Sequence, residues 1–205
     1  MLITIEGIDG SGKSSLVTSL TRSLADLSPV MTREPGETWV GASVRRAIAE
    51  EIDPIAEALL FVADHAVHLA TVVRPALKNN RLVISDRYTD SRYAYQQGTL
   101  EGLVPDPLAW LRQIHNGWTI IPELTFLLVI PIDVALIRCS GRGTREHFEY
   151  ASFLTKVQGN YLALAREDPS RFILIDAQKS EEEIQQFVSD AIRSAAARSQ
   201  SRHRH

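Results

Sequence analysis

Three observations predict an α/β fold with a mostly parallel sheet. Short apolar runs alternate along the chain with longer stretches of helical periodicity. Several of these runs are apolar throughout, which is typical of parallel strands covered by helices on both faces. The first run, in residues 2–15, ends in a glycine-rich turn that leads directly into a helical pattern. Together they predict one doubly wound α/β domain.

The expected elements follow in chain order. Leu2 to Glu6 is the first strand, and leucines spaced along residues 16–27 predict the helix after it. Asp53 and Pro54 form a good N-cap and first-turn pair for a long helix. Further strands are expected at 30–32, 82–85, 124–130 and 171–175, and helices at about 38–50, 54–78, 89–97, 107–117, 132–139, 147–166 and 180–197.

Length and composition fit one enzyme domain. The chain has 205 residues, of which 44% are hydrophobic and 23% charged, with a net charge of -3, so no general attraction to nucleic acid or membrane is expected. Cys139 is expected to be a packing residue, and we expect a cytoplasmic protein because no signal peptide or membrane span is evident. The domain is expected to cover residues 1–198, followed by a basic, flexible tail at 199–205.

The turn after the first strand matches a phosphate-binding pattern. Gly7, Gly12, Lys13 and Ser14 satisfy G-x-x-x-x-G-K-[ST], a loop whose backbone N–H groups surround nucleotide phosphates. Lys13 is expected to reach the β- and γ-phosphates, and Ser14 to place its hydroxyl on Mg²⁺. The loop is therefore expected to bind ATP.

Two further strand ends carry charged residues. Asp86 and Arg87 follow the apolar run 82–85, at the strand end where α/β folds hold their ligands. Asp86 is placed to organise Mg²⁺ through water, and Arg87 to bind a second anion with its planar fork. Arg33 ends another strand, before a Pro-Gly turn. Two arginines at two strand ends suggest an acceptor phosphate opposite the donor, although the alternative for Arg33 is a solvated Arg-Glu pair.

These motifs, taken in order, resemble a known family. EGIDGSGKSS, TREPG, LLFVAD, ISDRY, AYQ and HFEYASFLTKVQGNYLALA look like thymidylate kinase, and the likeness runs from residue 2 to about 177. The resemblance implies a three-layer P-loop kinase fold with a five-stranded parallel sheet flanked by helices. It also implies transfer of the γ-phosphoryl group of Mg²⁺-ATP to dTMP, and a homodimer packed through helices.

The resemblance also implies a set of site residues. ATP would be bound by Gly7, Ile8, Asp9, Gly10, Ser11, Gly12, Lys13, Ser14 and Ser15, with Arg138 and Ala177 near adenine. The acceptor would be bound by Asp9, Arg33, Phe61, His65, Arg87, Ser91, Arg92, Tyr95 and Gln96. The catalytic residues would be Lys13, Asp9, Arg87, Arg142 and Arg145, and the metal residues Ser14 and Asp86.

The helix 54–78 carries several of these groups. Its apolar stripe from Ile55 to Val73 is expected to pack either in the core or against a second copy of the chain in a dimer. Phe61, His65 and His68 fall on a neighbouring face, and Phe61 matches the thymine-stacking ring of the family. His65 and His68 have the spacing of a metal pair, but the sequence shows no third ligand nearby.

Two positions depart from the family pattern. The position of His65 is usually arginine, which reads a thymine oxygen, whereas the position of Arg92 is usually small or amide-bearing. We hypothesise that Arg92 replaces the missing guanidinium from the facing helix. The alternative is a changed base preference.

The stretch 138–147 is expected to be a lid over ATP. It places Arg138, Arg142 and Arg145 in a Gly-Ser-rich setting between two helices, where arginines can stabilise the charge of phosphoryl transfer and exclude water. The alternative is a solvated basic loop. Two other functions stay open: a kinase for another nucleoside monophosphate, and a P-loop ATPase or regulator without an acceptor.

Overall fold

The predicted sheet is present in full. The computed structural model describes the backbone of residues 1–139 and 144–202 and the side chains of residues 1–139 and 150–198. Its five strands have the order β2-β3-β1-β4-β5, and every neighbouring pair is parallel. The strands are β1 (Leu2–Gly7), β2 (Val30–Arg33), β3 (Val83–Asp86), β4 (Leu124–Val129) and β5 (Phe172–Asp176).

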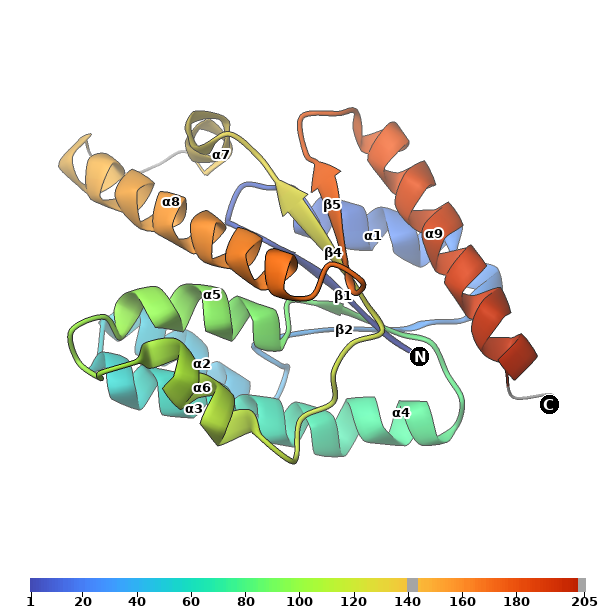
Figure 1. The fold of residues 1–205 in the computed structure, drawn as a ribbon, viewed down its shortest axis with the longest axis horizontal. Helices are drawn as coiled ribbons and strands as arrows, with labels where there is room; N and C mark the ends of the chain where they lie inside the picture. The colour runs from blue at the N-terminus through green and yellow to red at the C-terminus, as the bar shows by residue number, and fades with distance from the viewer. Residues whose placement is uncertain (140–143, 203–205) are drawn as a thin grey trace.

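Helices cover both faces of the sheet, which gives three layers (Figure 1). α1 and α9 pack together on one face, and α5 and α8 pack together on the other. The helical elements are α1 (Lys13–Ser23), η1 (Ala25–Leu27), α2 (Trp39–Glu50), α3 (Pro54–His68), η2 (Leu69–Val73), α4 (Arg74–Lys78), α5 (Thr89–Thr99), α6 (Pro107–His115), α7 (Ile132–Arg138), α8 (Thr144–Glu167) and α9 (Glu181–Arg202).

The sheet brings the charged strand ends to one edge. β1 is central and buried along its whole length. Its residue Ile5 pairs with Asp86 of β3, and Asp86 pairs in turn with Arg33 of β2. Because the strands are parallel, their carboxyl ends meet at the same edge, where ligands bind in such sheets. The loop after Gly7 therefore lies beside the end of β3.

The long helix predicted at 54–78 contains a π turn. It begins as expected, since the side chain of Asp53 accepts hydrogen bonds from the N–H groups of Ile55 and Ala56, both at 3.0 Å. The π turn η2 follows α3 without a break and leads into α4. A π turn takes more residues than an α turn, so it rotates the buried face. Leu69 is fully buried whereas Leu59 is 48% exposed, and the predicted apolar stripe is thus divided between core and surface.

Two boundaries differ from the prediction. α8 begins at Thr144, and α9 continues to Arg202 instead of ending near 197, so the segment predicted as a flexible tail overlaps this helix. Residues 194–200 are mostly Ala, Arg, Ser and Gln, which form helices readily enough without an apolar pattern. Hydrophobic periodicity therefore underestimated the helix length.

Candidate active site

The loop between β1 and α1 has the backbone shape of a phosphate site. Gly10 and Gly12 have φ angles of 78° and 93°, in the left-handed region that favours glycine. A Cβ atom at Gly10 would lie 2.4 Å from the carbonyl oxygen of Ala135, so a larger residue is excluded. α1 begins at Lys13, and its first N–H groups have no partner within the helix. The loop and the helix start together form an anion-binding concavity.

Lys13 is held inside this concavity. Its Nζ donates to the carbonyl oxygen of Ile8 at 2.8 Å and to Ser11 Oγ at 3.4 Å. Burial, together with the neighbouring positive charge of Arg87, lowers the pKa of Lys13 to about 7. A bound phosphate would favour the charged ammonium, since an opposite charge at short range stabilises it. Lys13 is therefore placed to take up a proton and an anion together.

A cavity of about 640 Å³ opens above the loop. Its lining residues are Asp9, Gly10, Gly12, Lys13, Ser14, Ser15, Asp86, Arg87, Arg138 and Glu181. Ser14 Oγ donates to Asp86 Oδ2 at 3.3 Å. Asp86 Oδ1 is buried and has no hydrogen-bond partner among the described residues. A hydroxyl beside a carboxylate with an unused oxygen fits a hydrated Mg²⁺, which prefers oxygen ligands and keeps several waters.

Arg87 lies at the end of β3 with an unusual backbone. Its φ angle is 65°, a left-handed conformation that costs a non-glycine residue energy and is found at functional sites. Its N–H donates to the carbonyl oxygen of Ile5 at 3.0 Å, and Ser85 Oγ donates to its carbonyl oxygen at 2.7 Å. Both the N–H and the carbonyl oxygen of Arg87 are thus held by hydrogen bonds, which fixes the turn.

The guanidinium of Arg87 is held by side chains from two other segments, the loop after β1 and α5. Nη2 donates to Asp9 Oδ1 at 2.5 Å and to Tyr95 Oη at 3.3 Å, and Nη1 donates to Ser91 Oγ at 3.2 Å. Tyr150 Oη donates to the other oxygen of Asp9 at 2.8 Å. Burial opposes ionisation of Asp9, but the positive charges of Arg87 and Lys13 lower its pKa below the usual value. Asp9 and Arg87 form an ion pair beside the phosphate loop.

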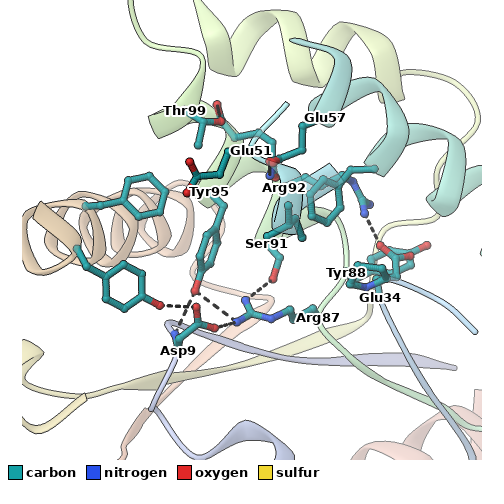
Figure 2. A pocket seen from close by; sticks show the side chains of 16 residues that line it. Asp9, Glu34, Glu51, Glu57, Arg87, Tyr88, Ser91, Arg92, Tyr95 and Thr99 are labelled. Carbon is teal, nitrogen blue, oxygen red and sulfur yellow. Dashed lines mark hydrogen bonds and ion pairs between the residues drawn. The ribbon is translucent and has the colours of Figure 1, made fainter. Parts of the chain in front are cut away.

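A second cavity, of about 490 Å³, extends away from this ion pair. It is lined by Asp9, Glu34, Pro35, Ile48, Glu51, Glu57, Phe61, Arg87, Tyr88, Ser91, Arg92, Tyr95, Gln96, Thr99, Tyr150 and Phe153. Figure 2 shows Asp9 and Arg87 at one end, and Arg92 with Glu34 at the other. Asp9 and Arg87 line both cavities. The two cavities therefore meet at this ion pair.

A buried polar cluster closes the far end of the second cavity. Glu34 Oε2 accepts from Arg92 Nη1, and Glu34 Oε1 accepts from Nδ1 of His65 and of His68, each at 2.7 Å. Burial favours the neutral acid, but the charge of Arg92 and the two histidine hydrogen bonds hold the pKa of Glu34 well below its usual range. The cluster thus contains one negative and one positive side chain, Glu34 and Arg92.

Comparisons with known proteins give the family of the chain. The family model of thymidylate kinase matches residues 5–188. The chain belongs to the thymidylate kinase family. A probable thymidylate kinase of Methanoculleus marisnigri is 60% identical over 204 residues, covering 100% of both chains. One of Methanospirillum hungatei is 61% identical over 193 residues, covering 94% of each. The crystal structure of thymidylate kinase from Ehrlichia chaffeensis is 27% identical, with a TM-score of 0.73, and the match covers 94% of this chain and 98% of that one.

Membership in the thymidylate kinase family confirms the predicted fold and reaction class. The chain is an ATP-dependent nucleoside monophosphate kinase, a phosphotransferase with a P-loop fold. The family uses ATP as the phosphate donor, and its substrates are nucleotides.

Most of the predicted acceptor residues lie together. The second cavity is lined by the predicted residues Asp9, Phe61, Arg87, Ser91, Arg92, Tyr95 and Gln96. Gln96 Nε2 donates to Glu57 Oε1 at 3.4 Å. Ser91 Oγ donates to Glu6 Oε2 at 2.6 Å, while burial and the charge of Asp90 raise the pKa of Glu6 to about 8. These contacts fix the side of α5 that faces the cavity.

Two predicted acceptor residues lie elsewhere. Arg33 lines a separate cavity with Ser14 and Asp86 and forms an exposed ion pair with Glu37. This is the Arg-Glu pair considered as an alternative from the sequence, although here the partner is Glu37. His65 is fully buried and does not line the second cavity. Its Nε2 lies 2.8 Å from Thr119 Oγ1, so both ring nitrogens are used within the protein.

The adenine and lid predictions have different outcomes. Arg138 Nη1 lies 3.5 Å from the carbonyl oxygens of Gly10 and Ala177, so the two residues predicted near adenine are together beside the loop. Arg142 lies outside the described residues. Arg145 belongs to the first turn of α8, but its side chain also lies outside the described part. The lid at 138–147 stays a prediction.

The sequence analysis missed three residues of the site. Glu34 was present in TREPG, but only Arg33 was considered. Tyr150 stands in the quoted stretch HFEYASFLTKVQGNYLALA but was given no role. His115, whose Nε2 accepts from Arg92 Nε at 3.1 Å, had no local signal, because it follows neither a strand nor a glycine-rich turn. Glu34 also supplies the third ligand that the histidine pair lacked, since donor atoms of Glu34, His65 and His68 lie within 4.8 Å of one another. The present contacts are hydrogen bonds, and the positive charge of Arg92 on Glu34 opposes a divalent cation there.

Proposed function

We propose that this protein transfers the γ-phosphoryl group of ATP to dTMP, giving dTDP and ADP. The observation that carries the proposal is the junction of the two cavities at Asp9 and Arg87. One cavity has the phosphate loop and Lys13, as a donor triphosphate requires. The other has an aromatic ring, Phe61, and polar groups suited to a base and sugar. An acceptor placed in it would direct its phosphate toward the donor.

Each residue of the phosphate end has a role in this reaction. Lys13 and the loop N–H groups would bind the β- and γ-phosphates and stabilise the charge of the transition state. Arg87, held by Asp9, Tyr95 and Ser91, would align the acceptor phosphate with its planar fork. Positioning and charge stabilisation supply most of the catalysis, and no covalent enzyme intermediate is needed. Arg142 and Arg145 are proposed to close over ATP from the lid.

Mg²⁺ is proposed to accompany ATP. Ser14 and Asp86 would hold it, Ser14 through its hydroxyl and Asp86 through a bound water. When bound, the ion neutralises charge on the β- and γ-phosphates.

The second cavity supports the remaining acceptor contacts. Phe61 would stack on the base, because an aromatic ring offers a flat apolar face. Tyr95 and Gln96 would contact the sugar or base, and Asp9 the deoxyribose hydroxyl. Arg33 would have to leave Glu37 to contact the acceptor phosphate.

A homodimer and a cytoplasmic location without membrane or nucleic acid are proposed as well. The helical stretch Pro54–Lys78 is long and apolar enough to cross a membrane by length and composition, and only 28% of its most apolar window is buried. Yet it packs against α2 and α5, and it carries the buried histidines of the site. We therefore propose that its exposed apolar face, which includes Leu59, packs against a second copy. Light scattering coupled to gel filtration would give twice the chain mass.

The test is product formation from Mg²⁺-ATP with dTMP, dUMP, UMP, dCMP, dGMP and AMP as separate acceptors. Rapid turnover of dTMP, with dUMP slower, supports the proposal. Turnover of another acceptor but not dTMP would indicate that the departures from the family pattern at His65 and Arg92 change the base preference. ATP hydrolysis without any acceptor turnover would favour the ATPase alternative.

A further inference from the structure

Three oxygen atoms form a closed ring against the guanidinium of Arg87. Ser91 Oγ lies 2.6 Å from Glu6 Oε2 and 2.7 Å from Tyr161 Oη, and Tyr161 Oη lies 2.9 Å from Glu6 Oε2. Arg87 Nη1 donates to Ser91 Oγ at 3.2 Å (Figure 2). The three residues of the ring come from β1, α5 and α8, and both Glu6 and Tyr161 are fully buried. The ring therefore connects the sheet and two helices to Arg87.

The three contacts of this ring need three hydrogen atoms. The hydroxyls of Ser91 and Tyr161 carry one donor hydrogen each. If both donate to a charged Glu6, the 2.7 Å contact between the two hydroxyl oxygens has no hydrogen in it. A proton on Glu6 Oε2 supplies the third, because Ser91 can then donate to Glu6, Glu6 to Tyr161, and Tyr161 to Ser91. Ser91 keeps a second lone pair for Arg87.

The surroundings of Glu6 also favour the neutral acid. Its other oxygen, Oε1, is buried and has no hydrogen-bond partner among the described residues, which is costly for a carboxylate. Burial and the negative charge of Asp90 raise the pKa of Glu6 to about 8, although Arg87 and the two hydroxyl hydrogen bonds act in the opposite direction. Tyr161 keeps its proton, because burial and Glu6 raise its pKa well above the usual value. The other charged group that interacts with Glu6 is Lys13, whose pKa an ionised Glu6 would raise.

The charge of Glu6 matters for an anion bound at Arg87. Asp9 already pairs with the guanidinium. A second negative charge behind it would weaken the attraction for a phosphate, since opposite charges nearby offset one another. A neutral Glu6 instead keeps Ser91 in place for Arg87 without adding charge.

We propose that Glu6 is a neutral acid in the active enzyme and a positioning residue, which acts through Ser91 and Tyr161 to orient Arg87 toward the acceptor phosphate. Glu6 itself lines neither of the two cavities. The inference rests on the proposed function for the acceptor phosphate, and it assigns a proton to a buried residue outside the nucleotide sites.

The kinetic test compares Glu6→Gln with the wild type. Glutamine has the shape of the neutral acid, carries no charge at any pH and offers amide hydrogens to the ring. kcat/KM for dTMP is measured at saturating Mg²⁺-ATP, where the triphosphate keeps Lys13 charged. Because a single ionisation near pH 8 leaves about a tenth of the neutral form at pH 9, the wild-type value should fall about tenfold from pH 7 to pH 9. Glu6→Gln should be within about threefold of the wild type at pH 7 and should not fall.

Asp64→Asn is the matched control. Asp64 is likewise buried with one oxygen that lacks a partner among the described residues, and burial raises its pKa. Its Oδ2 accepts from the N–H of Gly36 at 2.9 Å, and it lines neither cavity. The same acid-to-amide change there should leave the wild-type pH profile as it is.

Infrared difference spectra between pH 7 and pH 9 test the proton itself. The wild type should lose the carbonyl band of a protonated carboxyl group, Asp64→Asn should lose it too, and Glu6→Gln should show no such change. Wild-type protein with isotope-labelled glutamate should show the band shifted, which assigns it to a glutamate even if Glu6→Gln does not fold.

A loss of more than tenfold in kcat/KM at pH 7 in folded Glu6→Gln would overturn the inference, because the charged carboxylate would then be the active form. No shifted band in the labelled wild type, or a fall at high pH that Glu6→Gln retains, would overturn it as well. Absence of dTMP turnover in the wild type would refute the proposed function alone, since the infrared band does not depend on turnover and still decides whether Glu6 is neutral.

Discussion

The two ends of the active site are built in different ways. The phosphate end uses one short segment, Gly7 to Ser15, joined by the end of β3 and by Tyr95, Ser91 and Tyr150 around its Arg87–Asp9 pair. The base end has no such segment. Arg92, Glu34, His65, His68 and His115 come from α5, the turn after β2, α3 and α6, and they meet only in the folded chain.

Because of this difference, we expect the phosphate end to determine the rate of phosphoryl transfer and the base end to determine which base is selected. The phosphate end carries two cationic groups, Lys13 and Arg87, and burial with the charge of Arg87 lowers the pKa of Lys13 to about 7. At the base end the one guanidinium is paired with a carboxylate and surrounded by neutral rings. The first arrangement suits a charged transition state, and the second suits a neutral hydrogen-bonded base. Substitutions at the two ends should therefore have effects of different kinds.

The largest effect is expected at Lys13. Lys13→Met removes the cation from the phosphate loop, and kcat should fall about 10³-fold for every acceptor. Base preference should be unchanged, because the base end is untouched. Steady-state kinetics with dTMP and dUMP measure both quantities. If kcat fell by less than tenfold, Lys13 would not act on the transferred phosphate.

A smaller effect is expected at Arg87, where the acceptor phosphate is proposed to meet the loop. Arg87→Lys keeps the charge but loses the planar fork, and kcat/KM for dTMP should fall about 10²-fold. The Kd of ATP should change little. If ATP binding weakened as much as acceptor use, Arg87 would belong to the donor site instead.

Phe61 should affect acceptor binding alone. Phe61→Leu keeps an apolar side chain but removes the ring face, so the KM of dTMP should rise about tenfold, with kcat nearly unchanged. Ala58→Gly, three residues before Phe61 in α3, is the control for general damage to the helix, because Ala58 is fully buried and lines neither cavity. Equal KM changes in both variants would argue against stacking.

The last expected effect concerns acid stability rather than activity. His65 and His115 have pKa values lowered to about 4, in both cases by burial first and by Arg92 second. The unfolded chain binds more protons than the folded one between about pH 6.5 and pH 4, so stability falls as the pH is lowered through this window. For one such group the loss is on the order of 3 kcal/mol. Urea unfolding at several pH values should show a shallower acid loss for His115→Gln than for the wild type, and parallel curves would contradict this assignment.

Much of the fold and half of the site followed from local pattern. The five strands, the phosphate loop, Asp86 and Arg87 were readable because each motif lies next to a strand whose apolar run marks it. Arg33 was placed at the correct strand end, but its side chain pairs with Glu37 in another cavity. A strand end fixes the position of Cα and leaves the direction of a long side chain open.

The base end could not be predicted because its partners are distant in sequence. His115 is recognisable only once α6 packs against α5, and Glu34 only once His65 and His68 turn toward it. The π turn after α3 could not be predicted from the sequence either, since the apolar spacing over residues 55–73 fits a regular helix. The departure at Arg92 was visible in the sequence, but its fixed orientation required the three-dimensional structure.

The most direct test of this separation is the ratio of kcat/KM for dTMP to that for dCMP in the wild type and in Arg92→Lys. Lysine can still pair with Glu34, so the buried charge stays compensated, but it lacks the planar fork that donates to both Glu34 and His115. The account predicts that the ratio falls at least about tenfold, while the KM of ATP stays the same. An unchanged ratio in a folded Arg92→Lys enzyme would contradict it.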